Sequence, residues 1–161
     1  MKRKAIPPIV RKALISELEK LNELAARSEA YWGFDESHME AFKRLCALRE
    51  AHFKKGCVFV IEKDGEIAGF YCLAAKEADF ELEHFYVDPE HIAKGLGKTL
   101  WLHMRTFCIH RKIREVTIVC SDFVKGFYLK MGAASLGQVE STVDRGKMIP
   151  RLTYRIDPGT R

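Results

Sequence analysis

Apolar residues in the first part of the chain follow the period of an α-helix. They share one helical face at Leu14, Leu18, Leu21, Leu24 and Ala25. This spacing predicts a helix from about residue 14 to residue 28. The short apolar segment 9–11 before it is typical of a strand. After it, Asp35 or Ser37 can cap a second helix that we expect to run to about residue 49.

From residue 57 onward the pattern is that of strands. An apolar run over 57–61 is followed by Asp64-Gly65, a dipeptide typical of a tight hairpin turn. Further strands are predicted over 67–75, 80–87, 115–120, 134–143 and 148–156, with helices over 95–110 and 124–131. The strand over 80–87 ends before Pro89, because proline cannot donate to a central ladder. This order predicts a mixed α/β fold.

Length and composition are those of one globular domain. The chain has 161 residues, of which 47% are hydrophobic and 30% charged, enough to bury a core. No apolar run reaches the roughly 20 residues of a membrane helix, and the basic start lacks the apolar segment of a secretory signal. We therefore expect one domain over residues 1–161, with its core at about 9–156, in the cytoplasm and without a membrane partner.

The net charge of +5 allows an anionic ligand. Lysine and arginine are scattered, apart from short groups at residues 1–4 and 110–114, and no basic stripe alternates with aromatic residues. Nucleic acid is therefore not expected as a partner. A small molecule with several phosphates needs only a local positive site.

The cysteines favour neither disulfides nor a metal site. Their number is odd and no C-x-x-C pair occurs. We expect no metal site. The cysteines expected to be free structural thiols are Cys46, Cys57, Cys72, Cys108 and Cys120.

The segment most informative about function joins the predicted strand over 80–87 to the helix that follows, through Gly95 and Gly97. The first turn of a helix has backbone N–H groups without partners and a partial positive charge. Glycine lets this backbone approach an anion, and Lys94 and Lys98 add positive charge. We predict that a pyrophosphate binds here.

Two common nucleotide-binding motifs do not fit this segment. A P-loop would need glycine five positions before Gly97, where Ile92 stands, and a dinucleotide-binding fingerprint would need glycine in place of Leu100. A different phosphate-containing ligand is therefore expected.

The segment resembles the signature Q/R-x-x-G-x-G/A of the GNAT acyltransferase superfamily, except that Ile92 replaces glutamine or arginine. Residues 121–133 resemble the family segment N-x-x-A-x-x-F-Y-x-x-x-G-F. There Phe127, Tyr128 and Gly132 match, while Ser121 and Val124 replace the asparagine and the alanine. A bacterial subgroup with S-K-A-x-W-G-Y-D-like and G-R-x-L-P-like segments is more similar still, since residues 28–35 read SEAYWGFD and residues 146–150 read GKMIP.

This resemblance implies a central, largely antiparallel sheet flanked by helices. It also implies transfer of an acetyl group from acetyl-CoA to a primary amine by direct attack on the thioester. Acetyl-CoA is then the co-substrate, and no metal is needed. The implied cofactor-binding residues are Phe85, Tyr86, Val87, Ile92, Lys94, Gly95, Leu96, Gly97, Lys98, Thr99, Ser121 and Tyr128. The acceptor, a small-molecule or peptide amine, would meet an aromatic group at Tyr31, Trp32, Phe34 and His38.

The resemblance also implies catalytic roles. Tyr128 occupies the position of the acid that protonates the departing thiolate, although an aromatic residue there can also serve only packing. Glu81 and Glu83 are the candidates for the base. Strand alternation predicts that both share a face with Phe85 and Val87 unless a bulge intervenes.

Other functions stay open from the sequence. The first is a non-catalytic domain that binds or senses acyl-CoA, and the second is a small nucleotide-binding protein. The sequence does not separate acetyl from longer acyl donors, nor a monomer from a homodimer. It also leaves open whether the acceptor is a polyamine, an antibiotic, an amino acid or a protein.

Overall fold

Seven strands form one sheet in the order β1-β2-β3-β4-β5-β7-β6. The computed structural model describes residues 6–77 and 79–157, so the basic group at residues 1–4 lies outside the described residues. The strands are β1 (Ile9–Lys12), β2 (Val58–Lys63), β3 (Glu66–Ala75), β4 (Phe80–Val87), β5 (Glu115–Val119), β6 (Ala134–Glu140) and β7 (Met148–Arg155). Only β4 and β5 pair in parallel; the other neighbours are antiparallel. The predicted mixed, largely antiparallel fold is confirmed.

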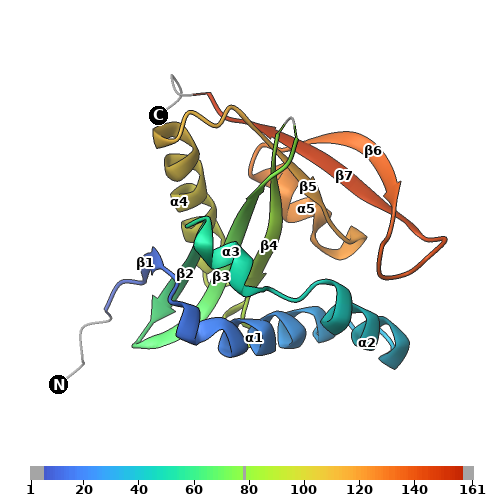
Figure 1. Ribbon diagram of the computed structural model, residues 1–161, viewed down its shortest axis with the longest axis horizontal. Coiled ribbons are helices and arrows are strands. Elements are labelled where there is room, and N and C mark those ends of the chain that lie inside the picture. The colour runs from blue at the N-terminus through green and yellow to red at the C-terminus, as the bar shows by residue number, and fades with distance from the viewer. Residues whose placement is uncertain (1–5, 78, 158–161) are drawn as a thin grey trace.

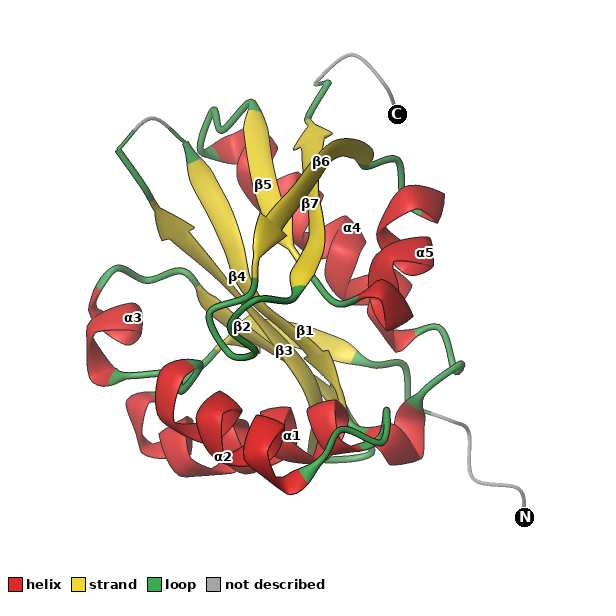
Figure 2. Cartoon of the chain, turned by 90° about the vertical axis from the view of Figure 1, so that its right-hand side faces the viewer, coloured by secondary structure: helices red, strands yellow, loops and turns green. Residues whose placement is uncertain are grey.

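Helices cover both faces of this sheet (Figures 1 and 2). One face carries α1 (Leu18–Ala30), α2 (Glu36–Leu45) and α3 (Glu50–Lys54), and the other carries α4 (Leu96–His110) and α5 (Asp122–Lys130). Short 3-10 turns, η1 (Ile15–Glu17) and η2 (Pro89–His91), precede α1 and α4. Among the described residues, none of these helices has the length and apolar character needed to cross a bilayer.

The second predicted helix is in fact two. Asp35, one of the two expected capping residues, caps α2 by accepting a hydrogen bond from the backbone N–H of His38 at 2.8 Å. The helix then stops at Leu45, because Leu48 is bonded elsewhere. The side-chain amide of Asn22 on α1 accepts from the Leu48 N–H at 2.8 Å and donates to its carbonyl at 3.0 Å. With this backbone fixed to α1, a separate short helix, α3, begins at Glu50.

A β-bulge in β4 overturns the predicted side-chain alternation. Cys72 of β3 pairs with His84, but the next residue of β3 pairs with Leu82, so Glu83 has no partner of its own. The extra residue changes which face the following side chains occupy. Phe85 packs with the α4 and α5 core, whereas Glu83 and His84 lie toward α3. The expectation that Glu81 and Glu83 share a face with Phe85 and Val87 was therefore wrong.

Strands β4 and β5 diverge soon after they meet. Their ladder consists of Phe80 with Val116 and Glu81 with Thr117. From Leu82 onward, the edge of β4 that faces β5 has no ladder partner among the described residues. Backbone N–H and C=O groups along this edge are free to bond an extended ligand.

All five cysteines are free thiols, which confirms the expectation from their number and spacing. Cys72, Cys108 and Cys120 are buried, and Cys46 and Cys57 are half-buried.

Candidate active site

The predicted anion site lies at the start of α4. The loop before it turns through left-handed conformations at Ala93 and Gly95, with φ of 64° and 81°. Glycine adopts this conformation without the steric cost that a side chain incurs. The first backbone N–H groups of α4 then point out of the helix without intrahelical partners. Leu96 contributes only through its backbone, because its side chain is buried in the core.

A groove of about 450 Å³ runs from this helix start along the open edge of β4 to α5. Of the predicted cofactor-binding residues, those that line it are Phe85, Val87, Ile92, Gly95, Gly97, Lys98 and Tyr128. Its charged lining residues are the lysines Lys98 and Lys130, and no aspartate or glutamate occurs among the described residues that line it. A groove of this charge suits a polyanion.

The remaining predicted cofactor residues do not line this groove. Tyr86 packs against Phe42 and Phe70 on the opposite face of the sheet, Lys94 is exposed, and Ser121 precedes α5 and lines a different cavity. The Thr99 hydroxyl donates back to the Gly95 carbonyl at 3.1 Å. The roles of these residues in cofactor binding stay predictions. They would have to act through their backbone or from the rim of the groove.

A second cavity, of about 260 Å³, adjoins the groove on the α1 and α2 side of the sheet. The two cavities share Ser28, Trp32, Phe85, Val124 and Tyr128. Of the predicted acceptor residues, Trp32, Phe34 and His38 line the second cavity, but Tyr31 does not. The Tyr31 ring is 54% exposed and meets Trp32 edge-on, with the ring centroids 5.0 Å apart.

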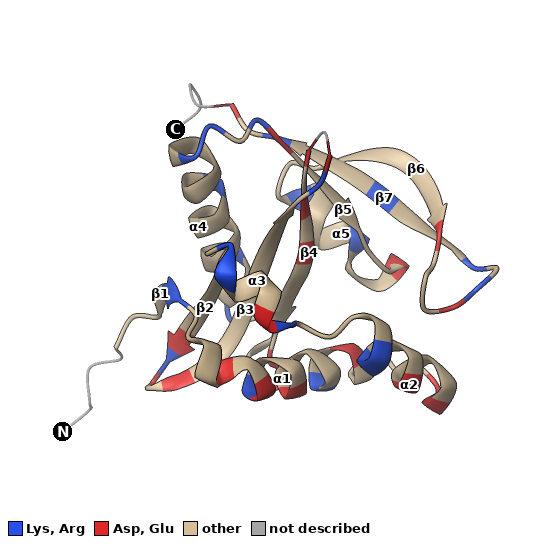
Figure 3. Cartoon of the chain, viewed as in Figure 1, with Lys and Arg blue, Asp and Glu red and all other residues tan. Residues whose placement is uncertain are grey.

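This second cavity is rich in carboxylates. Glu29, Glu81, Glu83 and Asp144 all line it, against one lysine, Lys147. Acidic residues are visible on α1, α2 and β4 in Figure 3. Both predicted bases, Glu81 and Glu83, thus line the cavity, but each forms an ion pair with a lysine. Lys76 lies 3.6 Å from the Glu81 carboxylate and 2.7 Å from that of Glu83.

An arrangement that the sequence did not reveal lies at the wall of this cavity. His38 is buried, with Nε2 3.1 Å from Glu29 Oε1 and Nδ1 2.7 Å from Asp144 Oδ2. The connection between β6 and β7 extends toward α2 (Figure 1) and carries Asp144 to this place. Burial raises the pKa of Glu29, and its hydrogen-bond contact with His38 partly opposes this effect. Only the position of Glu29 within the SEAYWGFD segment could have drawn attention to it.

Tyr128 stands where the two cavities meet. Its side chain is only 6% exposed and packs between the rings of Phe85, Trp101 and Phe127. Its hydroxyl oxygen is not fully buried, and the described residues offer it no hydrogen-bond partner. Burial, followed by the nearby Cys120 and Glu29, raises the pKa of this phenol, so the group holds its proton near neutral pH. The side chain both packs and presents a proton donor.

Comparisons with known proteins agree with this geometry. Residues 18–133 match the model of the acetyltransferase (GNAT) family. The 5-NmdU N-acetyltransferase of Pseudomonas phage PaMx11 is 30% identical over 132 residues, which cover 81% of this chain and 89% of that protein.

Two solved structures share the fold. The PaiA N-acetyltransferase from Thermoplasma acidophilum in complex with coenzyme A superimposes with a TM-score of 0.73 at 22% identity, over 93% of this chain and 99% of that one. The ribosomal-protein-S18-alanine N-acetyltransferase from Escherichia coli gives 0.70 at 14% identity, over 96% and 97%. The family match and the phage relative favour an enzyme over a non-catalytic acyl-CoA-binding domain. The chain belongs to the acetyltransferase (GNAT) family and is an acetyl-CoA-dependent N-acetyltransferase.

Proposed function

We propose that this enzyme acetylates a cationic primary amine, of a small molecule or a peptide, that enters the acidic second cavity. The observation that carries the proposal is the opposite charge of the two joined cavities. The groove has a basic lining that suits the phosphates of acetyl-CoA, while the second cavity has four carboxylates against one lysine. An alkyl ammonium ion is attracted to such a cavity.

On this proposal, acetyl-CoA lies along the groove. Its pyrophosphate meets the free N–H groups at the start of α4, near Gly97 and Lys98. Its pantetheine arm, which contains amides, extends along the open edge of β4 past Val87 and Phe85. The thioester then reaches the junction at Tyr128, one of the residues shared by both cavities.

The reaction itself needs three proton transfers, two from the nitrogen and one to the leaving thiolate. An alkyl ammonium ion with a pKa near 10.4 must lose a proton before its nitrogen can attack. The neutral nitrogen adds to the thioester carbonyl, and the tetrahedral intermediate collapses with cleavage of the carbon–sulfur bond while the nitrogen loses its second proton to solvent. The departing thiolate takes the phenol proton of Tyr128, which is later replaced from solvent. The products are the amide and CoA thiol.

We assign the base to Glu29 rather than to the glutamates of β4. A general base must be free to accept a proton, whereas Glu81 and Glu83 are paired with Lys76. Glu29 has a raised pKa and contacts His38, which in turn contacts Asp144. Once Glu29 has taken a proton, a neutral imidazole whose Nδ1–H donates to Asp144 accepts a hydrogen bond from the Glu29 carboxyl at Nε2. His38 can therefore take a proton onward from the Glu29 carboxyl.

The remaining expectations belong to the same proposal. We propose that the whole chain forms one catalytic domain, since strands from both halves of the sequence share one sheet. The cytoplasm is the compartment we propose, because five free thiols suit a reducing environment.

The test combines binding with turnover. An added Cβ at Gly97 would meet the Phe127 ring at 3.3 Å, and a glutamate there would place bulk and negative charge at the pyrophosphate. We expect calorimetry to show CoA binding to the wild type and none to Gly97→Glu. The matched control is Gly126→Glu on the exposed side of α5, where an added Cβ meets nothing within 4 Å. A panel of cationic and anionic amines, followed by thiol release, should give turnover with cationic amines only. Turnover of anionic amines alone would contradict the proposed acceptor class.

A further inference from the structure

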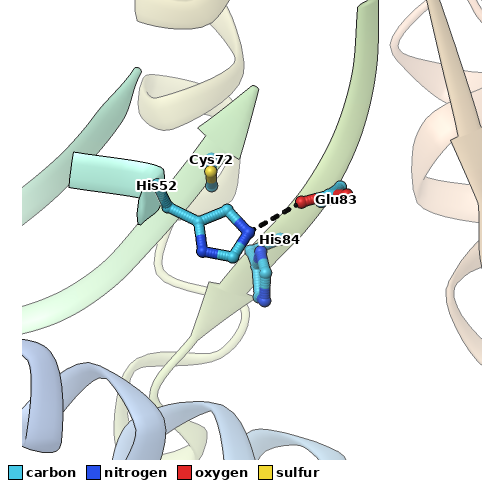
Figure 4. A group of neighbouring side chains, drawn as sticks. All are labelled: His52, Cys72, Glu83 and His84. Atoms are coloured by element: carbon cyan, nitrogen blue, oxygen red, sulfur yellow. Dashed lines mark hydrogen bonds and ion pairs between the residues drawn. The ribbon is translucent and has the colours of Figure 1, made fainter. Parts of the chain in front are cut away.

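Four side chains with metal-binding atoms meet between α3, β3 and β4 (Figure 4): His52, Cys72, Glu83 and His84. One ligand atom of each lies within 4.8 Å of those of the others. Glu83 and His84 are adjacent in sequence and would point to opposite faces of a regular strand. The bulge at Glu83 is what brings both to the same side.

His84 presents a buried lone pair to this cluster. The residue is only 5% exposed, and its Nε2 lies 2.9 Å from the carbonyl oxygen of Cys46. Because a carbonyl only accepts, Nε2 carries the proton of the neutral ring. Nδ1 is then an acceptor, and it is the one buried side-chain nitrogen or oxygen of the described residues that has no hydrogen-bond partner. A metal-binding histidine commonly donates its other N–H to a backbone carbonyl in this way.

His52 and Glu83 are also held in orientations that suit a shared ion. The His52 Nδ1 lies 2.9 Å from the Arg49 nitrogen and 3.2 Å from the Arg49 oxygen, so the backbone can hold either tautomer. With the proton on Nδ1, the Nε2 lone pair faces the cluster. The Glu83 Oε1 accepts from Lys76 at 2.7 Å, while Oε2, now 3.0 Å from His52 Nε2, is available as a ligand.

We propose that these four residues bind a divalent transition-metal ion, of which Zn²⁺ fits best. Two imidazoles, one thiolate and one carboxylate form a four-coordinate set that suits Zn²⁺ rather than Mg²⁺ or Ca²⁺. Ordinary Zn²⁺ bond lengths place tetrahedral ligand atoms roughly 3.3–3.6 Å apart. The side chains therefore need to close in by about 1 Å. The thiol proton of Cys72 is released as the ion binds, and the thiolate and carboxylate balance its charge.

This site lies outside the chemistry of acetyl transfer, which needs no metal. The ion would link the short helix α3 to two strands of the sheet. It would also hold Glu83, which lines the second cavity, and so keep that carboxylate from acting as a base. Because the unfolded chain lacks the assembled site, binding favours the folded state.

Co²⁺ is the probe of choice, because a thiolate ligand gives it charge-transfer absorption in the near ultraviolet and four-coordination gives it strong visible bands. The full chain is first freed of metal with a chelator and then titrated with Co²⁺. We expect one ion per chain with both spectral features, and Zn²⁺ should displace it. Cys72→Ser should lose the charge-transfer band, and His52→Ala should weaken binding at least about tenfold. His110→Ala, at an exposed histidine of α4, is the matched control and should behave like the wild type.

Two outcomes would overturn the proposal. One is a folded wild-type chain that shows no charge-transfer band with Co²⁺; the other is His52→Ala binding Co²⁺ as tightly as the wild type. His52 lies in a half-buried position on α3, so this variant keeps the test decisive even if Cys72→Ser fails to fold. The experiment measures metal binding and not acetyl transfer, so a negative result would leave the proposed function unaffected.

Discussion

At the scale of single residues, Tyr128 and Glu29 are held in the proposed site by different kinds of contact. Tyr128 is held by aromatic rings on three sides and gains its high pKa from burial. Any thiolate that leaves into the same buried place is also poorly solvated. The pKa of the thiol therefore rises as well, so that it lies closer to the raised pKa of the phenol. Glu29 instead depends on a partner from a distant loop, Asp144, through His38.

The first prediction concerns the proton donor. Tyr128→Phe keeps the ring and its packing but removes the hydroxyl. General acid catalysis contributes about 10²–10⁴-fold in rate, so we expect kcat to fall at least about tenfold while CoA affinity changes little. Steady-state kinetics with calorimetry separates the two quantities. Equal losses in binding and turnover would instead indicate that the hydroxyl contacts the cofactor.

The second prediction concerns the base. Glu29→Gln should lower kcat about 10²-fold near neutral pH, the range of general base catalysis, whereas Glu81→Gln, at a residue that lines the acidic cavity without acting as the base, should change kcat by no more than about twofold and act mainly on KM. A base acts when deprotonated, so wild-type kcat/KM should rise with pH through the raised pKa of Glu29. That limb of the profile should disappear in Glu29→Gln. A larger loss in Glu81→Gln or Glu83→Gln would return the role to β4.

At the scale of elements, the site depends on how α4 packs on the central strands. Gly69 in the middle of β3 lets this helix approach closely. A Cβ there would lie 2.8 Å from the backbone oxygen of Tyr86 and 3.2 Å from side-chain carbons of Ile61 and Leu100. The backbone oxygen cannot move without shifting β4, the strand that carries the open edge of the groove.

The third prediction follows from this contact. Gly69→Ala should destabilise the fold by about 1–3 kcal/mol through overpacking. Gly126→Ala, in an exposed helical position with nothing near the new Cβ, should instead be neutral or stabilise by up to about 1 kcal/mol. Urea unfolding of both variants measures the difference. If Gly69→Ala were as stable as the wild type, the close approach of α4 would be incorrect.

At the scale of the whole molecule, ion pairs connect separate elements of the fold. The Arg11 guanidinium contacts Glu17 at 2.8 Å and Glu62 at 2.7 Å, joining β1, η1 and β2. Arg27 on α1 contacts Asp88 at 2.7 Å, immediately before the loop that leads to α4. The Arg27–Asp88 pair therefore connects α1 to the segment that leads to the groove.

The fourth prediction is the acid dependence of stability. The hydrogen bond from Arg11 lowers the pKa of Glu17 against the effect of burial. At Asp88, burial is likewise outweighed by Arg27 and a backbone N–H, so its pKa is also lowered. In the unfolded chain both carboxyls titrate near 4. The unfolded state then binds more protons than the folded state just below that pH. The stabilisation from these groups is therefore complete above about pH 4 to 5 and is lost as the pH falls through the lowered folded-state values.

Urea unfolding between pH 3 and pH 6 should show the free energy of unfolding rising with pH. In Asp88→Asn the rise should be smaller, because one titrating group is removed. An unchanged slope in that variant would show that Asp88 gains nothing from Arg27 in the folded state.

The sequence by itself determined most of the elements, with the second predicted helix as the exception, and the place of the glycine-containing loop before α4. Helical and strand periodicities, the Asp64-Gly65 turn and the glycines before α4 are local signals, because they reflect backbone preferences over a few residues. The position of Tyr128 was also available, through the resemblance of the segment that contains it. The basic groove was expected from Lys98 and the helix start.

The tertiary structure alone decided the acceptor side. The bulge at Glu83 arises from pairing with β3, a partner that strand periodicity does not contain, and it reversed the predicted faces of β4. The contact of Glu29 with Asp144 through His38 joins residues more than a hundred positions apart, and the cluster around His84 joins three separate elements. Such groupings depend on how layers pack, since long-range packing, and not local preference, sets which side chains meet.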